Sequence, residues 1–286
     1  MYIDLHIHTT ASDGSLTPSQ VVRYAKEKNL KAISITDHDT IEGNEEAIME
    51  GRREGIEVVP RVEISVDYSP GTMHMLGYFI TIEDTPLKEK LTILQDSRAD
   101  RNPKIVKKLN EMSLALTYDE VAQESGGGQI GRPHIARVLV KKGYVKSIQE
   151  AFNKYLGKGA PAYIDKFRLS AKEAITVITN AGGIPVLAHP FTLNCNKSDE
   201  LDDLVERLVE QGLEGLEVYY SEHDERNTSH YHLLAKRYNL VITGGSDFHG
   251  KNMQGIDLGT GRGNLKIPYT LLERLRTLWE GKHTRC

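Results

Sequence analysis

The chain opens with Tyr2-Ile3-Asp4-Leu5-His6-Ile7-His8, in which apolar and polar side chains alternate. This period of two is typical of a β-strand. A helical pattern follows, because Thr17-Pro18 supplies an N-cap and a first-turn proline ahead of an apolar stripe. The stretch therefore predicts a β-strand that leads into a helix, which is the repeating unit of an α/β fold.

The same alternation of short apolar strands and amphipathic helices continues along most of the chain. Further strands are expected at residues 32–36, 56–59, 73–80, 184–188, 213–219 and 240–243. Further helices are expected at residues 41–53, 171–180, 201–211 and 228–238. Alternation on this scale predicts a mainly parallel sheet, either open or closed into a barrel.

One long segment interrupts the alternation and contains helical patterns only. These patterns cover residues 103–109, 118–123, 133–142 and 148–155. We therefore predict a barrel-like domain built from residues 1–96 and 167–286, with a helical insertion domain at residues 97–166. Such an insertion could cap a site in the other domain.

The composition is that of a soluble globular protein. The 286 residues include 36 Lys and Arg against 40 Asp and Glu, a formal net charge of −4. This mild acidity argues against binding to long duplex DNA, which favours a basic surface. No apolar run approaches the roughly 18 residues that span a bilayer, and the charged N-terminus has no signal-peptide pattern. We therefore expect a cytoplasmic protein with no membrane contact and no obligate protein partner.

Histidine and carboxylate side chains gather where the expected strands end. His6 and His8 are two residues apart at the end of the first strand, so both point to one face. Glu63 is expected to follow the third strand, and His74 to lie in the fourth. Because the carboxyl ends of barrel strands converge on one mouth, these side chains are expected to meet there. The full set is His6, His8, Asp13, His38, Glu63, His74, His189, Asp247 and His249.

Histidine combined with carboxylate suits a divalent ion such as Zn²⁺, Mn²⁺ or Fe²⁺. Nine ligands exceed the needs of one ion, since a catalytic zinc has about three protein ligands. We therefore expect two or three ions, with Glu63 or Asp247 bridging. Structural interpretations also exist: His74 could be a hydrogen-bonded core histidine, and the turn at Ser246-Asp247 could cap a helix. The coincidence at five or more strand ends favours the metal site.

Four blocks of the sequence contain most of these residues, with Glu63 and His74 in order between them: Asp4-Leu5-His6-Ile7-His8, Thr36-Asp37-His38-Asp39, Leu187-Ala188-His189-Pro190 and Gly245-Ser246-Asp247-Phe248-His249. On these blocks the chain resembles the PHP (polymerase and histidinol phosphatase) superfamily. Two further motifs lie in the insertion, Gly131-Arg132-Pro133-His134 and Gly157-Lys158-Gly159-Ala160-Pro161-Ala162-Tyr163. On these motifs it is more narrowly similar to the branch of 3′,5′-nucleoside bisphosphate phosphatases and the related 5′→3′ exoribonuclease.

The resemblance implies a trinuclear metal site in a distorted (β/α)7 barrel with a helical insertion. It implies that His6, His8, Glu63 and Asp247 hold the first metal ion. It further implies that a bridging Glu63 shares the second ion with His74 and His189, and that Asp13, His38 and His249 hold the third. Mn²⁺ is the preferred ion of this interpretation, with Fe²⁺ or Zn²⁺ as alternatives.

A metal cluster of this kind suits phosphoester hydrolysis, with a metal-bound hydroxide attacking phosphorus. Asp247 is expected to orient the hydroxide. His223 is a candidate acid for the leaving oxygen, the alternative being a solvent-exposed loop histidine. A second phosphate needs a clamp away from the metals, and arginine is favoured because its planar fork holds phosphate oxygens in pairs. The clamp candidates in the insertion are Arg98, Arg101, Arg132, His134 and Lys158.

The expected reaction is removal of the 3′-phosphate from a nucleoside 3′,5′-bisphosphate such as pAp, extending to short 5′-phosphorylated RNA. The main alternative is histidinol phosphatase or another small phosphomonoesterase. An amidohydrolase also begins with His-x-His at a barrel strand, but it needs neither nine ligands nor an arginine-bearing insertion. A binding or polymerase-associated module would not need a complete ligand set.

Overall fold

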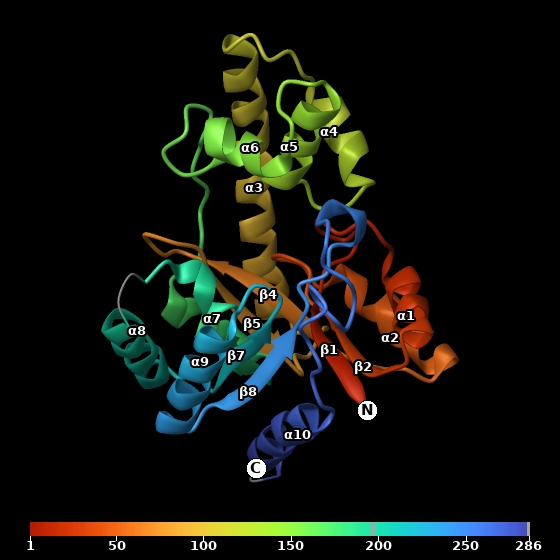
Figure 1. The fold of residues 1–286 in the computed structure, drawn as a ribbon, viewed down its shortest axis with the longest axis vertical. Helices are drawn as coiled ribbons and strands as arrows, with labels where there is room; N and C mark the ends of the chain where they lie inside the picture. The colour runs from red at the N-terminus through yellow and green to blue at the C-terminus, as the bar shows by residue number, and fades with distance from the viewer. Residues whose placement is uncertain (196–197, 285–286) are drawn as a thin grey trace.

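The computed structural model describes residues 1–195 and 198–284, and its strands form two sheets rather than one (Figure 1). The first sheet has the order β1-β2-β3 and the second β4-β5-β6-β7-β8. The strands are β1 Tyr2–Ile7, β2 Leu30–Ile35, β3 Glu57–Val59, β4 Arg61–Val66, β5 Met73–Tyr78, β6 Ile184–Leu187, β7 Gly215–Tyr220 and β8 Val241–Gly245. The predicted α/β class is therefore confirmed.

The first sheet is parallel throughout, as the sequence predicts. Helix α1 (Pro18–Glu27) begins where the sequence places it, because Thr17 accepts from the backbone N–H of Gln20 and the Gln20 side chain accepts from the Thr17 N–H. Helix α2 (Glu42–Glu54) follows β2 and packs against α1. These two helices cover the first sheet beside β1 and β2 (Figure 1).

The second sheet corrects the expectation of a mainly parallel arrangement. Strand β4 has no counterpart among the expected strands, and it pairs antiparallel with β5, which pairs antiparallel with β6. Only residues 67–72 separate β4 from β5, and so short a connection permits an antiparallel pair but not a parallel crossover. The remaining pairs, β6-β7 and β7-β8, are parallel.

The two sheets meet at their edges without closing into one hydrogen-bonded barrel. At one seam, the N–H of Asp247 donates to the carbonyl of His6 at 2.8 Å and that of His8 to the carbonyl of Phe248 at 2.9 Å. At the other, an isolated bridge joins His38 to Glu63. The seams bring the strand ends of both sheets together, although the closed (β/α)7 barrel itself is not formed by the described strands.

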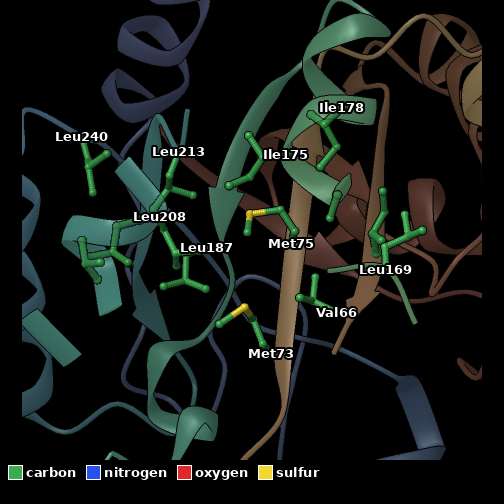
Figure 2. Packing of buried hydrophobic residues seen from close by; sticks show 14 of the residues in the cluster. Val66, Met73, Met75, Leu169, Ile175, Ile178, Leu187, Leu208, Leu213 and Leu240 are labelled. Carbon is green, nitrogen blue, oxygen red and sulfur yellow. The ribbon is translucent and has the colours of Figure 1, made fainter. Parts of the chain in front are cut away.

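The remaining helices outside the insertion are α7 Ala171–Asn180, α8 Ser198–Glu210, α9 Glu225–Arg237 and α10 Thr270–His283, with short 3-10 turns η2 Pro190–Leu193 and η3 Gly250–Asn252. Of these, α7, α8 and α9 pack against the second sheet, whereas α10 packs against strands of both sheets. Figure 2 shows Ile175 and Ile178 of α7 beside Met75 of β5, in a cluster that continues to Leu187. This packing buries one face of the sheet and fixes β5, which carries His74, and β6, which leads directly to His189. No helix in the described part of the chain combines the length and apolar character needed to cross a membrane.

A long helix carries the helical insertion away from the sheets (Figure 1). This helix is α3 (Thr85–Glu111), capped by Asp84, and it runs through Pro103, where the sequence suggested a helix start. It crosses residue 97, so the chain has no break at the expected boundary, and the division into two domains stays a prediction. The other elements are α4 Tyr118–Ser125, α5 Arg132–Lys141, α6 Ile148–Ala151 and the π-helical turn η1 Phe152–Leu156. They bury a separate apolar cluster against the outer half of α3.

Candidate active site

All nine predicted metal ligands come together where the strands of the two sheets end. They fall into four overlapping groups in which one ligand atom from each residue lies within 4.8 Å of the others. The groups are His8, Asp13, His38 and His249; His6, His8 and Asp247; His6, Glu63 and His189; and His38, Glu63 and His74. The sharing of residues between groups fits two or three neighbouring ions better than one.

Glu63 lies at the centre of the cluster and is fully buried. Its Oε1 is 2.9 Å from Nδ1 of His74 and 3.1 Å from Nε2 of His189. Its Oε2 is 2.9 Å from Nδ1 of His38 and 3.3 Å from Nε2 of His8. The sequence predicted that Glu63 follows the third strand, but it lies within a strand of its own, β4. The two carboxylate oxygens therefore face different histidines, and Glu63 belongs to two of the four groups.

Two further carboxylates complete the charge of the cluster. Asp247 Oδ1 lies 3.1 Å from Nε2 of His8, and Asp13 Oδ1 lies 3.3 Å from Nε2 of His249. Burial alone would raise the pKa of each carboxyl group. The surrounding histidines outweigh it and hold the pKa of Asp13, Glu63 and Asp247 well below the usual range. The three carboxylates therefore stay ionised and supply negative charge to a cation.

Unpartnered buried atoms show that the cluster fits metal ions. Nε2 of His6, Nδ1 of His38 and Oε2 of Glu63 are buried and make no hydrogen bond of regular geometry among the described residues, although the last two atoms lie only 2.9 Å apart. An unpaired buried polar atom costs about 1–3 kcal/mol, and imidazole nitrogen and carboxylate oxygen are ligands for divalent transition metals. The helix-cap interpretation of the Ser246 turn does not apply, because the Ser246 hydroxyl donates to Asp4.

The sequence did not reveal Glu217, which orients two of these histidines. Glu217 is fully buried in β7. Its Oε1 lies 2.9 Å from Nδ1 of His6, and its Oε2 accepts from the backbone N–H of His189 at 2.8 Å. A carboxylate on the far nitrogen of a ligating histidine fixes the ring and its tautomer. The available signal was a lone glutamate inside the apolar strand Leu216–Tyr220.

Other buried groups hold the loops that carry the cluster. Oδ1 of Asp37 accepts from the backbone N–H of Thr9 at 2.8 Å and from the hydroxyl of Ser12 at 2.5 Å. These bonds fix the loop before Asp13. The hydroxyl of Tyr220 donates to Oδ2 of Asp247 at 3.0 Å, leaving Oδ1 free to face the histidines.

A cavity of about 530 Å³ leads from the cluster to the insertion. Asp13, His38 and His74 line one end. Four of the predicted clamp residues, Arg98, Arg101, Arg132 and Lys158, line the part next to the insertion, together with Lys166 and Arg168. Lys166 and Arg168 were not predicted, because a basic residue on a connecting segment has no distinguishing sequence pattern.

Two of the cavity arginines lack a neutralising carboxylate. No Asp or Glu of the described residues lies within ion-pair distance of Arg101 or Arg132, although Arg101 is only 2% exposed. Burial lowers the pKa of Arg101, and the neighbouring Arg98 and Arg132 lower it further. Burial also lowers the pKa of Arg132 to about 10. Arg101 is therefore a buried cation and Arg132 a half-buried one, and an anion such as phosphate would stabilise both.

Two predicted histidines lie outside the cavity lining. His134 is 1% exposed, and its Nδ1 accepts from the N–H of Gly131 at 2.8 Å, so it caps α5 rather than facing substrate. His223 is buried behind Tyr220 and not in an exposed loop, with Nδ1 bonded to the carbonyl of Val218 at 2.9 Å. Burial lowers the pKa of His223 to about 4, so near neutral pH the ring is uncharged and its one proton is held on Nδ1 against the Val218 carbonyl, which leaves Nε2 without a proton to donate. The placement of both residues argues against the contacts predicted for them.

The PHP domain model matches residues 4–165, and the chain belongs to the PHP domain family. A 3′,5′-nucleoside bisphosphate phosphatase of Chromobacterium violaceum is 33% identical over 262 residues, 90% of each chain. The 5′-3′ exoribonuclease Rnm of Escherichia coli is 34% identical over 248 residues, 86% of this chain and 84% of its own. The solved structure of a C. violaceum amidohydrolase, with bound sulfate and no metal, is 30% identical with a TM-score of 0.87, covering 97% of this chain and 96% of that one.

The family and the sequence relatives make this protein a phosphoric ester hydrolase. The ligand cluster is that of an enzyme that uses divalent metal ions.

Proposed function

We propose that the protein removes the 3′-phosphate from nucleoside 3′,5′-bisphosphates such as pAp. The observation that carries this proposal is a single cavity with two chemically different ends. One end has the metal-ligand cluster, and the other has the buried Arg101 and the half-buried Arg132, neither of which has a carboxylate partner among the described residues. A nucleotide with a phosphate on each side of its ribose matches both ends.

In this proposal the chain's residues bind and orient the substrate. Arg101 and Arg132 hold the 5′-phosphate, and Lys158 at the rim adds charge. Asp247, held by Tyr220, faces the position of the 3′-phosphate. When bound by the nine cluster residues, two or three divalent ions would supply a nucleophile at neutral pH and neutralise charge on the phosphorus oxygens. We propose Mn²⁺ as the ion, with Fe²⁺ and Zn²⁺ to be compared.

The same arrangement extends to short 5′-phosphorylated RNA, because both reactions cleave the phosphoester beyond a 5′-phosphorylated nucleotide. The names of the two sequence relatives, a bisphosphate phosphatase and an exoribonuclease, support both substrates. Histidinol phosphate is disfavoured, since its ammonium group would meet the cavity cations. Amide hydrolysis gives no role to the arginine end.

A substrate panel tests the proposal. Metal-reconstituted protein is assayed for phosphate release from pAp, 3′-AMP, 5′-AMP and histidinol phosphate. Fast release from pAp that leaves 5′-AMP, with slow turnover of 3′-AMP and histidinol phosphate, supports the proposal. Equal turnover of all monoesters would still be consistent with a metal site, but it would overturn the assignment of Arg101 and Arg132 to the 5′-phosphate.

A further inference from the structure

Asp39, next to the predicted ligand His38, is bonded to three separate parts of the fold: strand β4, helix α3 and the segment that carries Lys166. It is fully buried, and its φ of 53° lies in the left-handed region. Its N–H donates to the carbonyl of Glu63 at 2.8 Å, which ties it to β4. Its own carbonyl accepts from Nε2 of Gln95 on α3 at 2.9 Å. The backbone of Asp39 is therefore fixed between the ligand loop and the long helix.

The two carboxylate oxygens of Asp39 have different partners. Oδ1 accepts from the backbone N–H of Ser65 at 2.7 Å, within the sheet. Oδ2 accepts from Nε and Nη2 of Arg98 at 2.9 and 2.6 Å and from Nζ of Lys166 at 3.2 Å. The hydroxyl of Ser65 also donates to Oδ2 at 3.0 Å. Oδ2 alone therefore contacts both cations.

These two cations stand on the two arms that connect the insertion to the sheets. Arg98 lies on the outgoing helix α3, and Lys166 lies on the segment that returns from η1 to α7 (Figure 1). Their side chains are only 11% and 4% exposed. Desolvated charge pairs of this kind hold a fixed geometry, because breaking them leaves a buried charge without a partner. Both arms are thus bonded to the residue that follows His38.

We propose that Asp39 is a positioning residue that sets the distance between the phosphate clamp and the metal cluster. It acts through Arg98 and Lys166, which flank the same cavity as Arg101 and Arg132. The inference rests on the proposed function for its substrate, since the clamp is assigned there to the 5′-phosphate. Selectivity for 5′-phosphorylated substrates then depends on a carboxylate that does not itself line the cavity.

The substitution Asp39→Asn separates the two roles of the carboxylate. Asparagine tolerates the left-handed backbone, and its carbonyl oxygen can still accept from the Ser65 N–H. Its amide group would replace Oδ2 and present hydrogens to Arg98 and Lys166. A shift of the arms by about 1 Å costs on the order of 10²-fold in rate. We expect kcat/KM for pAp to fall by about that factor, with unchanged turnover of 3′-AMP and unchanged metal content.

Glu124→Gln is the matched control. Glu124 also pairs with one arginine and one lysine, Arg137 and Lys141, but all three lie within the insertion and none of them lines the cavity. This variant should keep wild-type selectivity. An Asp39→Asn protein that loses pAp and 3′-AMP activity equally, or that loses its metal, would overturn the inference, because the residue would then act on the ligand loop alone. Unchanged selectivity would also overturn it.

Amide hydrogen exchange gives a second readout that needs no substrate. In Asp39→Asn, exchange in residues 163–168 should become faster, whereas Glu124→Gln should match wild type in that segment. If the wild-type enzyme shows no preference for pAp, the proposed function fails and this exchange result alone decides whether Asp39 holds the arms. If Asp39→Asn does not fold, the double variant Asp39→Asn with Lys166→Met is used instead, because it removes the Asp39 anion together with one of its two buried cations. The same hydrogen-exchange measurement is then made on the double variant.

Discussion

Replacing Glu217 by glutamine should weaken metal binding without changing the fold. Glu217 contacts no predicted metal position and acts through the far nitrogen of His6 and the backbone of His189. Glutamine has the same shape, but it offers one carbonyl oxygen where glutamate has two. Both partners are donors in the tautomer that leaves Nε2 of His6 free for a metal. One of the two hydrogen bonds must therefore be lost.

The expected size follows from that loss. A hydrogen bond to a charged group contributes about 1.5–3 kcal/mol, and removal of a buried partner of a ligating histidine lowers metal affinity by about 10- to 100-fold. Burial would raise the pKa of Glu217, but His6 and neighbouring cations lower it, so a full charge is removed. We expect the dissociation constant for Mn²⁺ to rise within that range, with a matching loss of activity that excess Mn²⁺ restores.

Titration calorimetry and elemental analysis of the dialysed protein measure this effect. Glu214→Gln is the control, because Glu214 precedes the same strand and pairs at the surface with Lys282. That variant should bind metal as wild type does. Wild-type metal affinity in Glu217→Gln would refute the assignment of Glu217 as the support of His6 and His189.

Three further predictions concern the cavity, a buried histidine and the metal ions. Arg132→Ala should raise KM for pAp about 10²-fold while sparing 3′-AMP, because only pAp places a 5′-phosphate against this guanidinium; equal loss on both substrates would contradict the clamp. His223→Asn should leave kcat unchanged. Because folded His223 has a pKa of about 4 against 6.5 when unfolded, its stabilising effect is lost as pH falls from 6.5 to 4. Denaturant unfolding should therefore show wild type losing up to about 3 kcal/mol more than the variant over that window, and equal losses would contradict neutral burial. Chelation should abolish phosphatase activity and lower Tm, since bound ions stabilise the folded chain, and a Tm that chelation leaves unchanged would count against ion binding at Glu63.

The sequence predicted that these nine His, Asp and Glu side chains lie together, because strand ends are visible in the pattern of side chains. Alternation up to His8 and the glycine pair before Asp247 mark where strands stop, and strand ends converge in any such fold. Glu63 was predicted as a ligand although strand β4, which contains it, was not predicted, because Glu63 lies shortly after the strand expected at residues 56–59. Only Pro60 separates β3 from β4, so the sequence pattern of residues 57–66 did not reveal that two strands lie there.

The sequence could not show contacts made by burial across distant segments. Glu217 has ordinary strand neighbours, and only the folded chain brings it to His6. His134 and His223 have the residue type of catalytic groups, but packing by α5 and by Tyr220 removes them from the cavity. Charge compensation is equally non-local: Arg98 and Lys166 are 68 positions apart and share Asp39, whereas Arg101 has no such partner among the described residues.

A crystal structure of the protein with Mn²⁺ and 5′-AMP tests the central claim most directly, because 5′-AMP is the product that keeps the 5′-phosphate. The account predicts ions among the nine cluster residues and the 5′-phosphate against Arg101 and Arg132, with the ribose 3′-oxygen directed at the cluster. A 5′-phosphate bound at the metal ions, with the arginine end left to solvent, would contradict it.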